Sequence, residues 1–481
     1  MREKEVKKNL QKAILSRLSS VPGVSSVTLV GSFNDRDDMT GISDIDTIVI
    51  CDRLNLEIYN KCLEKAQSIP LEECGLKRFR LKSNTSFGPL KFDEPKLVVL
   101  HLMIYDTEGH RRHVIASPFT CLDWERSKCL VGKSLKDIFP VGRLQPRDFL
   151  EARRGLGNYL EDLRIGMISI RDYEFGKNRV SEVRRTHPLD ARHRGEFAFH
   201  IVRNLVCNSM KLKYNENRFY QTQELEIGMD ELFEGVSSKH IDNFRHLNRL
   251  KEQRSKVFPE WTLGWAEEFI ADFQQAFLSR WRASRTIYFM RHAPTSLNDG
   301  TFLGQGRDPG ILNDETISLN DIGIETIYSS PARRCIETAK VLIPELNPIT
   351  EERLHEINYA SAEGLTFEKL KELHPEIIQA WSNGEDPNFP DDGENISDVQ
   401  SRLQNFIEEL DEKKGGATVV VTHNVVLRCL IGKSHSIPQQ DWYSLSIPHA
   451  EPLEFKILNG TLYSNINRNQ LGKIFSGLIN I

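Results

Sequence analysis

The chain has 481 residues and a formal net charge of −5, with 39% hydrophobic and 27% charged residues. This length exceeds that of a usual domain two- to threefold, so we expect at least two domains. No apolar run approaches the ~20 residues that span a bilayer, which excludes a membrane-spanning protein. The acidic balance argues against a bulk nucleic-acid binder. The first residues lack the apolar stretch of a secretory signal and contain acidic residues that a transit peptide avoids, which favours a cytoplasmic location.

The first 146 residues have the pattern of a mixed α/β domain. Leu10, Ile14 and Leu18 recur at helical spacing and predict an amphipathic helix. Three runs rich in β-branched residues predict strands at 27–30, 47–50 and 96–104. Eight cysteines are scattered along the whole chain without a Cys-x-x-Cys pair, which favours reduced thiols over disulfides or a structural metal.

Strand patterns fade over residues 147–284, and we expect a helical subdomain there. Phe197, Ile201 and Leu205 would share one helix face. From Thr286 onward, strands alternate with helices, which is typical of an α/β domain over 285–481. The expected fold class is therefore multidomain α/β and α+β, with a mixed sheet, a helical subdomain and a C-terminal three-layer α/β domain.

Four separated segments of the last domain carry residues suited to phosphate chemistry. A histidine that attacks phosphorus must be neutral, must lie among cations and needs a proton donor for the leaving oxygen. Arg291 and His292 end one predicted strand, and His423 directly follows another. Arg334 stands at the start of a predicted helix, and Glu356 is a candidate proton donor.

The order of these motifs resembles the histidine phosphatase superfamily, which includes the cofactor-dependent phosphoglycerate mutases. The motifs are Arg-His, Ser-Ser-Pro-x-x-Arg-x-x-x-Thr-Ala, Leu-x-Glu and Val-Val-Thr-His, over about residues 285–470. The resemblance implies that His292 is phosphorylated and that Glu356 is the general acid. Arg291, Arg334 and His423 would bind the phosphoryl group, and no cofactor is implied for this half.

The sequence departs from the family pattern at several points. Ala293-Pro294 replaces the usual Gly-Glu after the nucleophile, and Thr422-His423-Asn424 replaces a usual Ser-His-Gly. Only 20 residues separate Asp308 from Ser329, so the usual helix of that stretch is expected to be lost or reduced. The long insertion of the mutases is missing, which favours hydrolysis over transfer between hydroxyls.

A second chemistry is indicated near the N-terminus. Gly31 and Ser32 form a turn whose backbone N–H groups could cradle a triphosphate, and Asp44 and Asp46 share one face of a predicted strand. Converging carboxylates are typical Mg²⁺ ligands. Together the motifs resemble the nucleotidyltransferase superfamily of DNA polymerase β, which implies nucleotide binding by Gly31 and Ser32 and metal binding by Asp44 and Asp46.

The third carboxylate that this resemblance implies has no obvious counterpart. The strand over residues 97–104 contains His101 but no acid, and Asp106 follows just beyond it. Either Asp106 or a substrate group completes the site, or the domain binds nucleotide without turnover.

Residues 151–214 carry a local excess of positive charge in an acidic chain. Basic and polar side chains recur there at helical spacing. They belong either to a solvated helix face or to a groove for the triphosphate or an anionic acceptor, and they are Arg192, Arg194, His200, Arg203 and Asn204.

The leading hypothesis is a bifunctional cytoplasmic enzyme. Its N-terminal half would transfer a nucleoside monophosphate from an NTP, with Mg²⁺, and its C-terminal half would hydrolyse a phosphomonoester, with a phosphorylated small molecule as substrate. Two alternatives remain open. One is a single active phosphatase regulated by a degenerate nucleotide-binding module, and the other is a nucleic-acid end-processing enzyme, which the acidic balance disfavours.

Overall fold

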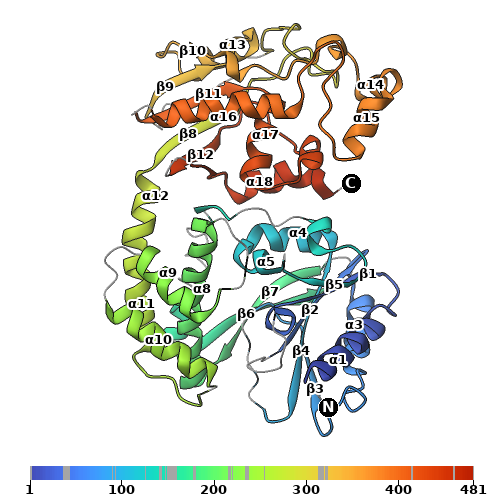
Figure 1. Cartoon of the computed structure of the whole chain (residues 1–481), viewed down its shortest axis with the longest axis vertical. Coiled ribbons are helices and arrows are strands. Elements are labelled where there is room, and N and C mark those ends of the chain that lie inside the picture. Colours follow the sequence, from blue (N-terminus) through green and yellow to red (C-terminus); the bar gives the residue numbers. More distant parts are fainter. Residues whose placement is uncertain are drawn as a thin grey trace. The chain divides into compact units, whose positions relative to one another are not determined.

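The chain divides into two compact units (Figure 1). Unit 1 comprises Met1–Leu144 and Asp148–Ser279, and unit 2 comprises Gln145–Arg147 and Arg280–Ile481. The computed structural model describes residues 3–479 except for 36–43, 89, 91, 93, 125, 140–143, 147, 149–159, 177–179, 215–217, 219, 233–237, 254, 313–318, 320–322, 413–414 and 459–460. The predicted boundary at residue 147 lies outside the described residues.

Unit 1 contains a five-stranded mixed sheet with the order β3-β4-β2-β1-β5. The central strand β2 runs parallel to β4 and antiparallel to β1, while β3 is parallel to β4 and β5 antiparallel to β1. The strands expected from the sequence correspond to β1, β2 and β4. The bounds are β1 Val24–Val30, β2 Ile45–Cys51, β3 Arg80–Asn84, β4 Leu97–Asp106 and β5 Lys128–Val131.

Helix α1 covers this sheet with the face that the sequence predicts. Its Leu10, Ile14 and Leu18 are buried with side chains of β1, β2 and β4 in one core. Helix α3 begins where the Asn55 side chain accepts the Ile58 N–H group, an ordinary N-cap. The helices of this part are α1 Glu3–Leu18, α2 Ser32–Asp35, α3 Leu56–Gln67, α4 Thr107–Ala116, α5 Pro118–Trp124 and α6 Leu135–Ile138.

The region expected to be wholly helical contains a β-hairpin, so that expectation is wrong for part of it. Strands β6 (Met167–Phe175) and β7 (Val180–Pro188) pair antiparallel. In β6, Ile168 and Ile170 are buried at the two-residue spacing of a strand. Strand β7 is largely polar and exposed, so its hydrophobic pattern is too weak to predict a strand.

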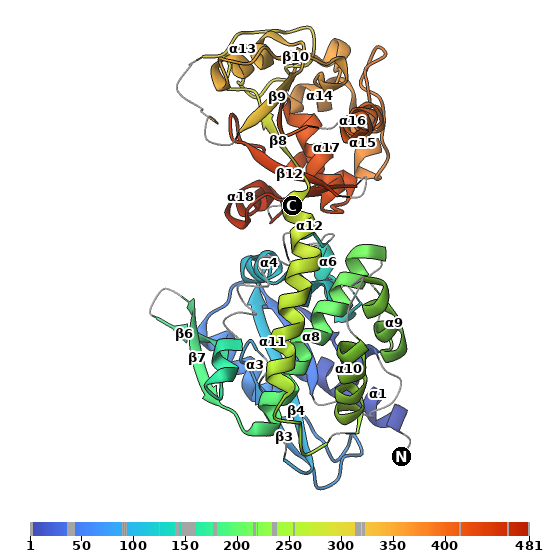
Figure 2. The same cartoon turned by 90° about the vertical axis from the view of Figure 1, so that its left-hand side faces the viewer.

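Helices α8 to α11 follow in the described part of unit 1, and Figure 2 shows α8, α10 and α11 side by side. The predicted face of α8 is confirmed, because Phe197, Ile201 and Leu205 are buried. Helix α11 continues into a π-helical turn over Gln274–Leu278. Within the described residues, none of the helices is both long and apolar enough to cross a membrane. The bounds are α8 Ala191–Tyr214, α9 Thr222–Leu232, α10 Ser238–Glu252 and α11 Thr262–Phe273.

Unit 2 is built on a six-stranded sheet with the order β10-β9-β11-β8-β12-β13. The first four strands in this order are parallel, and β12 and β13 are antiparallel to their neighbours. The carboxyl ends of β8, β9 and β11 therefore meet at one edge, where open α/β sheets place their sites. The bounds are β8 Arg285–Arg291, β9 Ile324–Ser329, β10 Ile349–Thr350, β11 Ala417–Thr422, β12 Leu453–Leu458 and β13 Thr461–Ser464.

Apolar side chains from β8, β9, β11 and α13 form a core of this unit. The shortened stretch between Asp308 and Ser329 falls partly outside the described residues, so the predicted loss of its helix stays a prediction. The helices are α12 Ser279–Ala283, α13 Arg333–Leu342, α14 Phe367–Leu373, α15 Pro375–Ser382, α16 Ile396–Glu412, α17 Asn424–Ser434 and α18 Arg468–Ile474. Short 3₁₀ turns lie at Glu352–Leu354, Ala360–Ala362, Gln439–Ser444 and Phe475–Ile479.

Gln145 belongs to unit 2, although it follows 144 residues of unit 1. Its side chain is 3% exposed, its Nε2 group donates to the Ser434 carbonyl at 2.7 Å, and its Oε1 atom accepts the Ser464 N–H group at 3.0 Å. The amide thus links the last residue of α17 to the last residue of β13.

We expect Gln145→Ala to lower the free energy of unfolding of unit 2 by roughly 1–3 kcal/mol, because it leaves a buried carbonyl and a buried N–H group without partners. Urea unfolding followed by the loss of phosphatase activity would measure the change. Gln379→Ala, which removes a surface amide of α15, is the matched control. Equal midpoints for the Gln145 and Gln379 variants would contradict the prediction.

Candidate functional site

The candidate phosphate site lies at the carboxyl edge of the unit 2 sheet. His292 directly follows β8 and His423 directly follows β11, and their ring centroids are 5.5 Å apart. The His292 N–H group donates to the Thr422 carbonyl at 3.0 Å, which continues the strand pairing up to the histidine. The parallel register of β8 and β11 therefore sets the spacing of the two imidazoles.

His292 is held as a neutral imidazole with a defined tautomer. Its Nδ1–H group donates to the Ala293 carbonyl at 2.8 Å, so the lone pair is on Nε2. Burial, together with the positive charges of Arg334 and Arg291, lowers the pKa of His292 to about 2. A nucleophilic histidine needs this state, a neutral ring with a free lone pair on Nε2.

Arg334, on the first turn of α13, is fully buried beneath the site. Its guanidinium donates to the Gly304 carbonyl at 2.8 Å and to His423 Nδ1 at 3.1 Å. Since Nδ1 of His423 accepts, its Nε2 carries the proton and donates to Ser330 Oγ at 2.8 Å. Burial and the charge of Arg334 lower the pKa of His423, so this ring is also neutral.

The loop over residues 304–307 wraps around Arg334 and is organised by one carboxylate. Glu363 accepts the backbone N–H groups of Gln305, Gly306 and Arg307 at 2.6 to 3.1 Å. Gly304 has φ +64°, and a Cβ atom there would lie 2.0 Å from Glu363 Oε1. The Gly-Gln-Gly-Arg motif and the later Glu-Gly pair are therefore two halves of one loop structure.

Glu356 is buried at the N-terminus of α17. Its carboxyl group accepts the N–H groups of Ile357 at 3.1 Å and of Val425 at 3.2 Å. Burial raises the pKa of Glu356 despite these bonds and the nearby positive charges of Arg334 and Arg291. A raised pKa favours the protonated carboxyl group, which is the form that a general acid requires.

Arg291 completes the predicted set. Its Nη1 group donates to the Ile447 carbonyl at 3.0 Å, and its charge interacts with those of Glu356 and Arg334. Burial lowers the pKa of Arg291 to about 10, which leaves it a cation at neutral pH. The structure therefore brings all five residues predicted from the sequence together around one site: Arg291, His292, Arg334, Glu356 and His423.

Sequence reasoning missed several side chains of this site. Burial raises the pKa of the Tyr359 hydroxyl, which interacts with the charges of Glu356 and Arg428. Arg428 donates through Nε to the Leu445 carbonyl at 3.0 Å, and His449 lies 5.3 Å from the His292 ring. Arg428 follows His423 by little more than one helical turn and could have been found from that spacing, whereas His449 follows an unpatterned loop.

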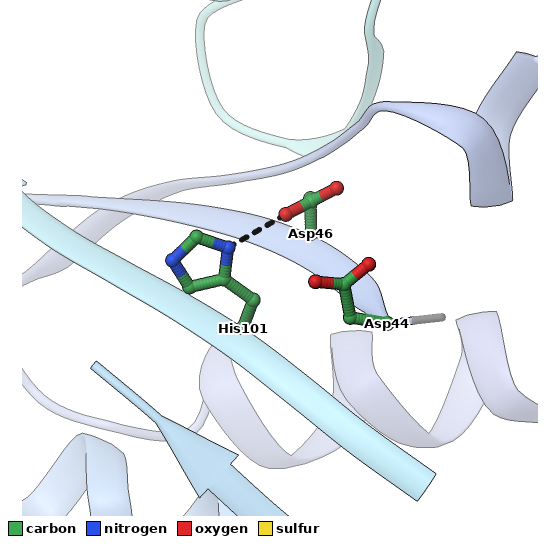
Figure 3. A group of neighbouring side chains, drawn as sticks. All are labelled: Asp44, Asp46 and His101. Carbon is green, nitrogen blue, oxygen red and sulfur yellow. Dashed lines mark hydrogen bonds and ion pairs between the residues drawn. The ribbon is translucent and has the colours of Figure 1, made fainter. Parts of the chain in front are cut away.

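In unit 1, Asp44, Asp46 and His101 form a cluster whose ligand atoms all lie within 4.8 Å of one another (Figure 3). The β2–β4 register places Asp46 opposite His101. Asp46 Oδ1 accepts from His101 Nδ1 at 2.7 Å, and the Ser86 carbonyl accepts from His101 Nε2 at 2.8 Å. Two carboxylates and an imidazole are a donor set that fits a divalent cation.

His101 forms an ion pair with Asp46 in this arrangement. Burial opposes its protonation, but the hydrogen bond and the charge of Asp46 raise the pKa of His101 overall. Gly31, with φ +72°, lies under the same carboxylate, and a Cβ atom there would be 2.4 Å from Asp46 Oδ2. Ser32 begins α2 directly after this turn, while residues 41–43 of the motif lie outside the described residues.

Asp106 does not complete this cluster, so that expectation is wrong. It pairs with Cys51 at the far end of β2, five residues or about 16 Å from Asp46. Its carboxylate instead caps α4 by accepting the Gly109 N–H group at 2.8 Å. The position opposite Asp46 on β4 is occupied by His101.

The basic residues proposed to line a groove are partly engaged within unit 1. Arg192 and His200 both contact the Glu196 carboxylate on the same helix, at 3.6 and 3.5 Å. Arg194 donates to the Arg164 carbonyl at 3.3 Å. Glu196 is a buried acid that the sequence analysis did not single out. These contacts favour a helix face stabilised by its own ion pairs, and Arg203 and Asn204 stay predictions as groove residues.

Comparisons with known proteins agree with the unit 2 site. The family model of the histidine phosphatase superfamily (branch 1) matches residues 287–463. A phosphoglycerate mutase-like protein 4 of Arabidopsis thaliana is 30% identical over 184 residues, which cover 37% of this chain and 71% of that protein. Phosphoserine phosphatase 1 of Hydrogenobacter thermophilus is 32% identical over 158 residues, covering 30% of this chain and 73% of that protein.

A further relative is a probable fructose-2,6-bisphosphatase of Schizosaccharomyces pombe. It is 23% identical over 265 residues, which cover 51% of this chain and 64% of that protein. The family match leaves the nucleotidyltransferase resemblance of unit 1 without support, because it begins at residue 287. Through residues 287–463, the chain belongs to the histidine phosphatase superfamily (branch 1), and its C-terminal unit is a phosphatase of that superfamily.

Proposed function

We propose that unit 2 hydrolyses a phosphomonoester through a phosphohistidine intermediate on His292. The observation that carries this proposal is the neutral His292 ring, whose lone pair is on Nε2, among Arg291, Arg334 and His423. Cations that hold the phosphoryl oxygens also keep the imidazole unprotonated, because a second positive charge there is unfavourable.

The reaction would proceed in two balanced steps. His292 Nε2 attacks phosphorus, the P–N bond forms and the P–O ester bond breaks, while Glu356 gives its proton to the leaving oxygen. Water then attacks the phosphohistidine, Glu356 takes the proton from that water, and the P–N bond breaks to release phosphate. Arg291 and Arg334 would stabilise the charge on the equatorial oxygens in both steps.

We further propose a small phosphorylated metabolite as substrate. The relatives named after phosphoserine and fructose 2,6-bisphosphate point to compact anionic substrates. Arg428 and Tyr359, beside Glu356, extend the positive and hydrogen-bonding character of the site beyond the phosphoryl group. Phosphate release from a panel of phosphorylated sugars, hydroxy acids and amino acids would test this, and a uniform, feeble rate on all of them would argue against a small metabolite.

Glu356→Gln should lower the rate of phosphoenzyme formation from an alkyl phosphate by about 10² to 10⁴-fold, because the amide cannot give a proton to a poor leaving group. On p-nitrophenyl phosphate the loss in this step should be much smaller, since nitrophenolate leaves without protonation. In the wild-type protein, phosphoenzyme formation from the alkyl ester should be constant below the raised pKa of Glu356 and should fall as pH increases through it. Single-turnover quench across pH would measure both effects.

Glu352→Gln is the matched control, because this glutamate lies one turn earlier and pairs with His355 at the surface. Equal losses on the two substrates in the Glu356 variant would contradict a role as general acid.

Nucleotidyl transfer by unit 1 is the second function we propose. It is supported by the convergence of Asp44, Asp46 and His101 and by the Gly31–Ser32 turn beside them. A divalent cation such as Mg²⁺, when bound, would neutralise triphosphate charge and orient the α-phosphate. The carboxylates of Asp44 and Asp46 would hold it, with His101 as a third ligand after release of its Nδ1 proton, and the N–H groups that follow Gly31 would face the phosphates.

Two alternatives for unit 1 lead to different results in one assay. Incubation with α-labelled NTPs and a panel of phosphorylated metabolites or RNA ends would reveal transfer and its acceptor. Nucleotide binding without transfer would favour a regulatory module that acts on a single active phosphatase, as the imidazole in place of a third carboxylate allows. Labelled RNA ends would favour nucleic-acid end processing.

A further inference from the structure

The peptide unit that joins His292 to Ala293 is held at both of its polar groups. Its carbonyl oxygen, that of His292, accepts the Nδ1–H group of His449 at 2.8 Å. Its N–H group, that of Ala293, donates to Thr338 Oγ1 at 2.9 Å. Since a peptide unit is planar, two bonds on opposite edges fix its rotation about the chain.

This rotation bears directly on the nucleophile. The Nδ1–H group of His292 is anchored on the Ala293 carbonyl, the next carbonyl along the chain. If the preceding peptide turned, Ala293 would move and the ring would lose the bond that keeps the lone pair on Nε2. A shift of ~1 Å in a reacting group can cost about 10²-fold in rate.

His449 is itself fixed against the end of β8. The Ala450 N–H group donates to the Arg291 carbonyl at 2.9 Å, and the Ile447 carbonyl accepts Arg291 Nη1 at 3.0 Å. The ring of His449 packs edge to face against that of His292, with centroids 5.3 Å apart. The segment that precedes β12 thus contacts both the backbone and the side chain of the strand end that carries the nucleophile.

We propose that His449 is a positioning residue for phosphatase catalysis, which with Thr338 clamps the His292–Ala293 peptide and so aims Nε2 of His292 at phosphorus. This inference rests on the phosphohistidine mechanism proposed above. Thr338 reaches the clamp from α13, where its hydroxyl donates to the Arg334 carbonyl at 2.7 Å. The clamp thereby ties the nucleophile to the helix that carries the buried phosphate-binding arginine.

Two substitutions separate donation of the hydrogen bond from packing. His449→Leu introduces an apolar side chain of similar length and removes the hydrogen-bond donor, whereas His449→Asn keeps an N–H group near the position of Nδ1. We expect the leucine variant of the full chain to lose about 10- to 10²-fold in kcat on p-nitrophenyl phosphate with KM changed by less than about threefold. The asparagine variant should recover most of kcat.

Single-turnover quench with the same ester should place the loss in phosphoenzyme formation. Wild-type kcat in the leucine variant would overturn the inference. Equal losses of kcat and of melting temperature in the leucine and asparagine variants would also overturn it, because they would indicate a role in packing alone. An increase in KM at unchanged kcat would overturn it as well, because it would indicate a contact with the substrate. His292→Ala separates failure of the phosphohistidine mechanism from failure of the His449 inference. Hydrolysis by the His292 variant would refute the mechanism. An inactive His292 variant together with a fully active leucine variant would refute only the role of His449.

Discussion

Replacement of His292 by alanine should abolish phosphatase activity of the full chain, with a loss of roughly 10⁴-fold or more in kcat. The variant lacks the atom that forms the P–N bond. His423 cannot replace it, because its Nε2 carries a proton that is donated to Ser330 Oγ. Phosphate release from p-nitrophenyl phosphate, with acid-labile ³²P on the protein as a second readout, would measure the effect.

The matched control is His374→Ala, which removes a partly exposed histidine that precedes α15 in the same unit. It should retain wild-type hydrolysis and wild-type labelling. Normal turnover by the His292 variant, or persistent acid-labile label in it, would mean that another residue carries the phosphoryl group.

Asp46→Asn should remove nucleotidyl transfer, with a loss of at least about 10²-fold, while phosphatase activity stays at the wild-type rate. The substitution takes one negative charge from a cluster of two carboxylates and an imidazole, and the lost cation affinity removes charge stabilisation worth several kcal/mol. Transfer from α-labelled NTP in the presence of Mg²⁺ or Mn²⁺, once the acceptor is found, is the measurement.

Asp106→Asn controls for a general effect of losing a carboxylate from the same sheet, because Asp106 is the last residue of β4, five residues beyond His101, and caps α4. It should leave transfer unchanged. A transfer rate in the Asp46 variant equal to that of the Asp106 variant would leave unit 1 without metal-dependent chemistry at this cluster.

The fold of both units was predictable where the hydrophobic pattern is strong. Buried strands such as β2 and β11 are rich in β-branched residues, and α1 repeats its apolar residues every four positions. The β6–β7 hairpin was missed because one of its strands is polar and exposed, so local sequence says little about it. Tertiary pairing, here through the Phe87–Arg171 bridge, contributes what the local pattern lacks.

The phosphatase site shows the same division. Residues that follow strands, such as His292 and His423, could be placed together because parallel strands share a carboxyl edge. The Gly304 loop and Glu363 could be recognised as motifs, but their mutual bonding depends on a loop closure of 58 residues that no periodicity encodes. His449 contacts the nucleophile from 157 residues away, and its loop carries no pattern that would indicate this contact.

In unit 1, the position of the carboxylates in the Asp44–Asp46–His101 cluster was predictable, but its third member was not. Asp44 and Asp46 follow from strand alternation, whereas the third member depends on the β2–β4 register. A parallel register cannot be read from sequence, because a shift by two residues preserves every side chain's face. The pairing of β2 with β4 therefore places His101, which is not an acid, opposite Asp46.

Because Gln145–Arg147 belong to unit 2, the chain passes three times between the units: after Leu144, after Arg147 and after Ser279. End-to-end fusion of two genes produces a single junction, whereas this connectivity embeds a short piece of one unit inside the sequence of the other. The phosphatase unit is therefore not encoded by one continuous segment of the chain. A proteolytic cut near residue 280 should leave the pieces associated in a native gel, and the C-terminal fragment freed by urea should recover activity better when a peptide containing residues 144–148 is added back.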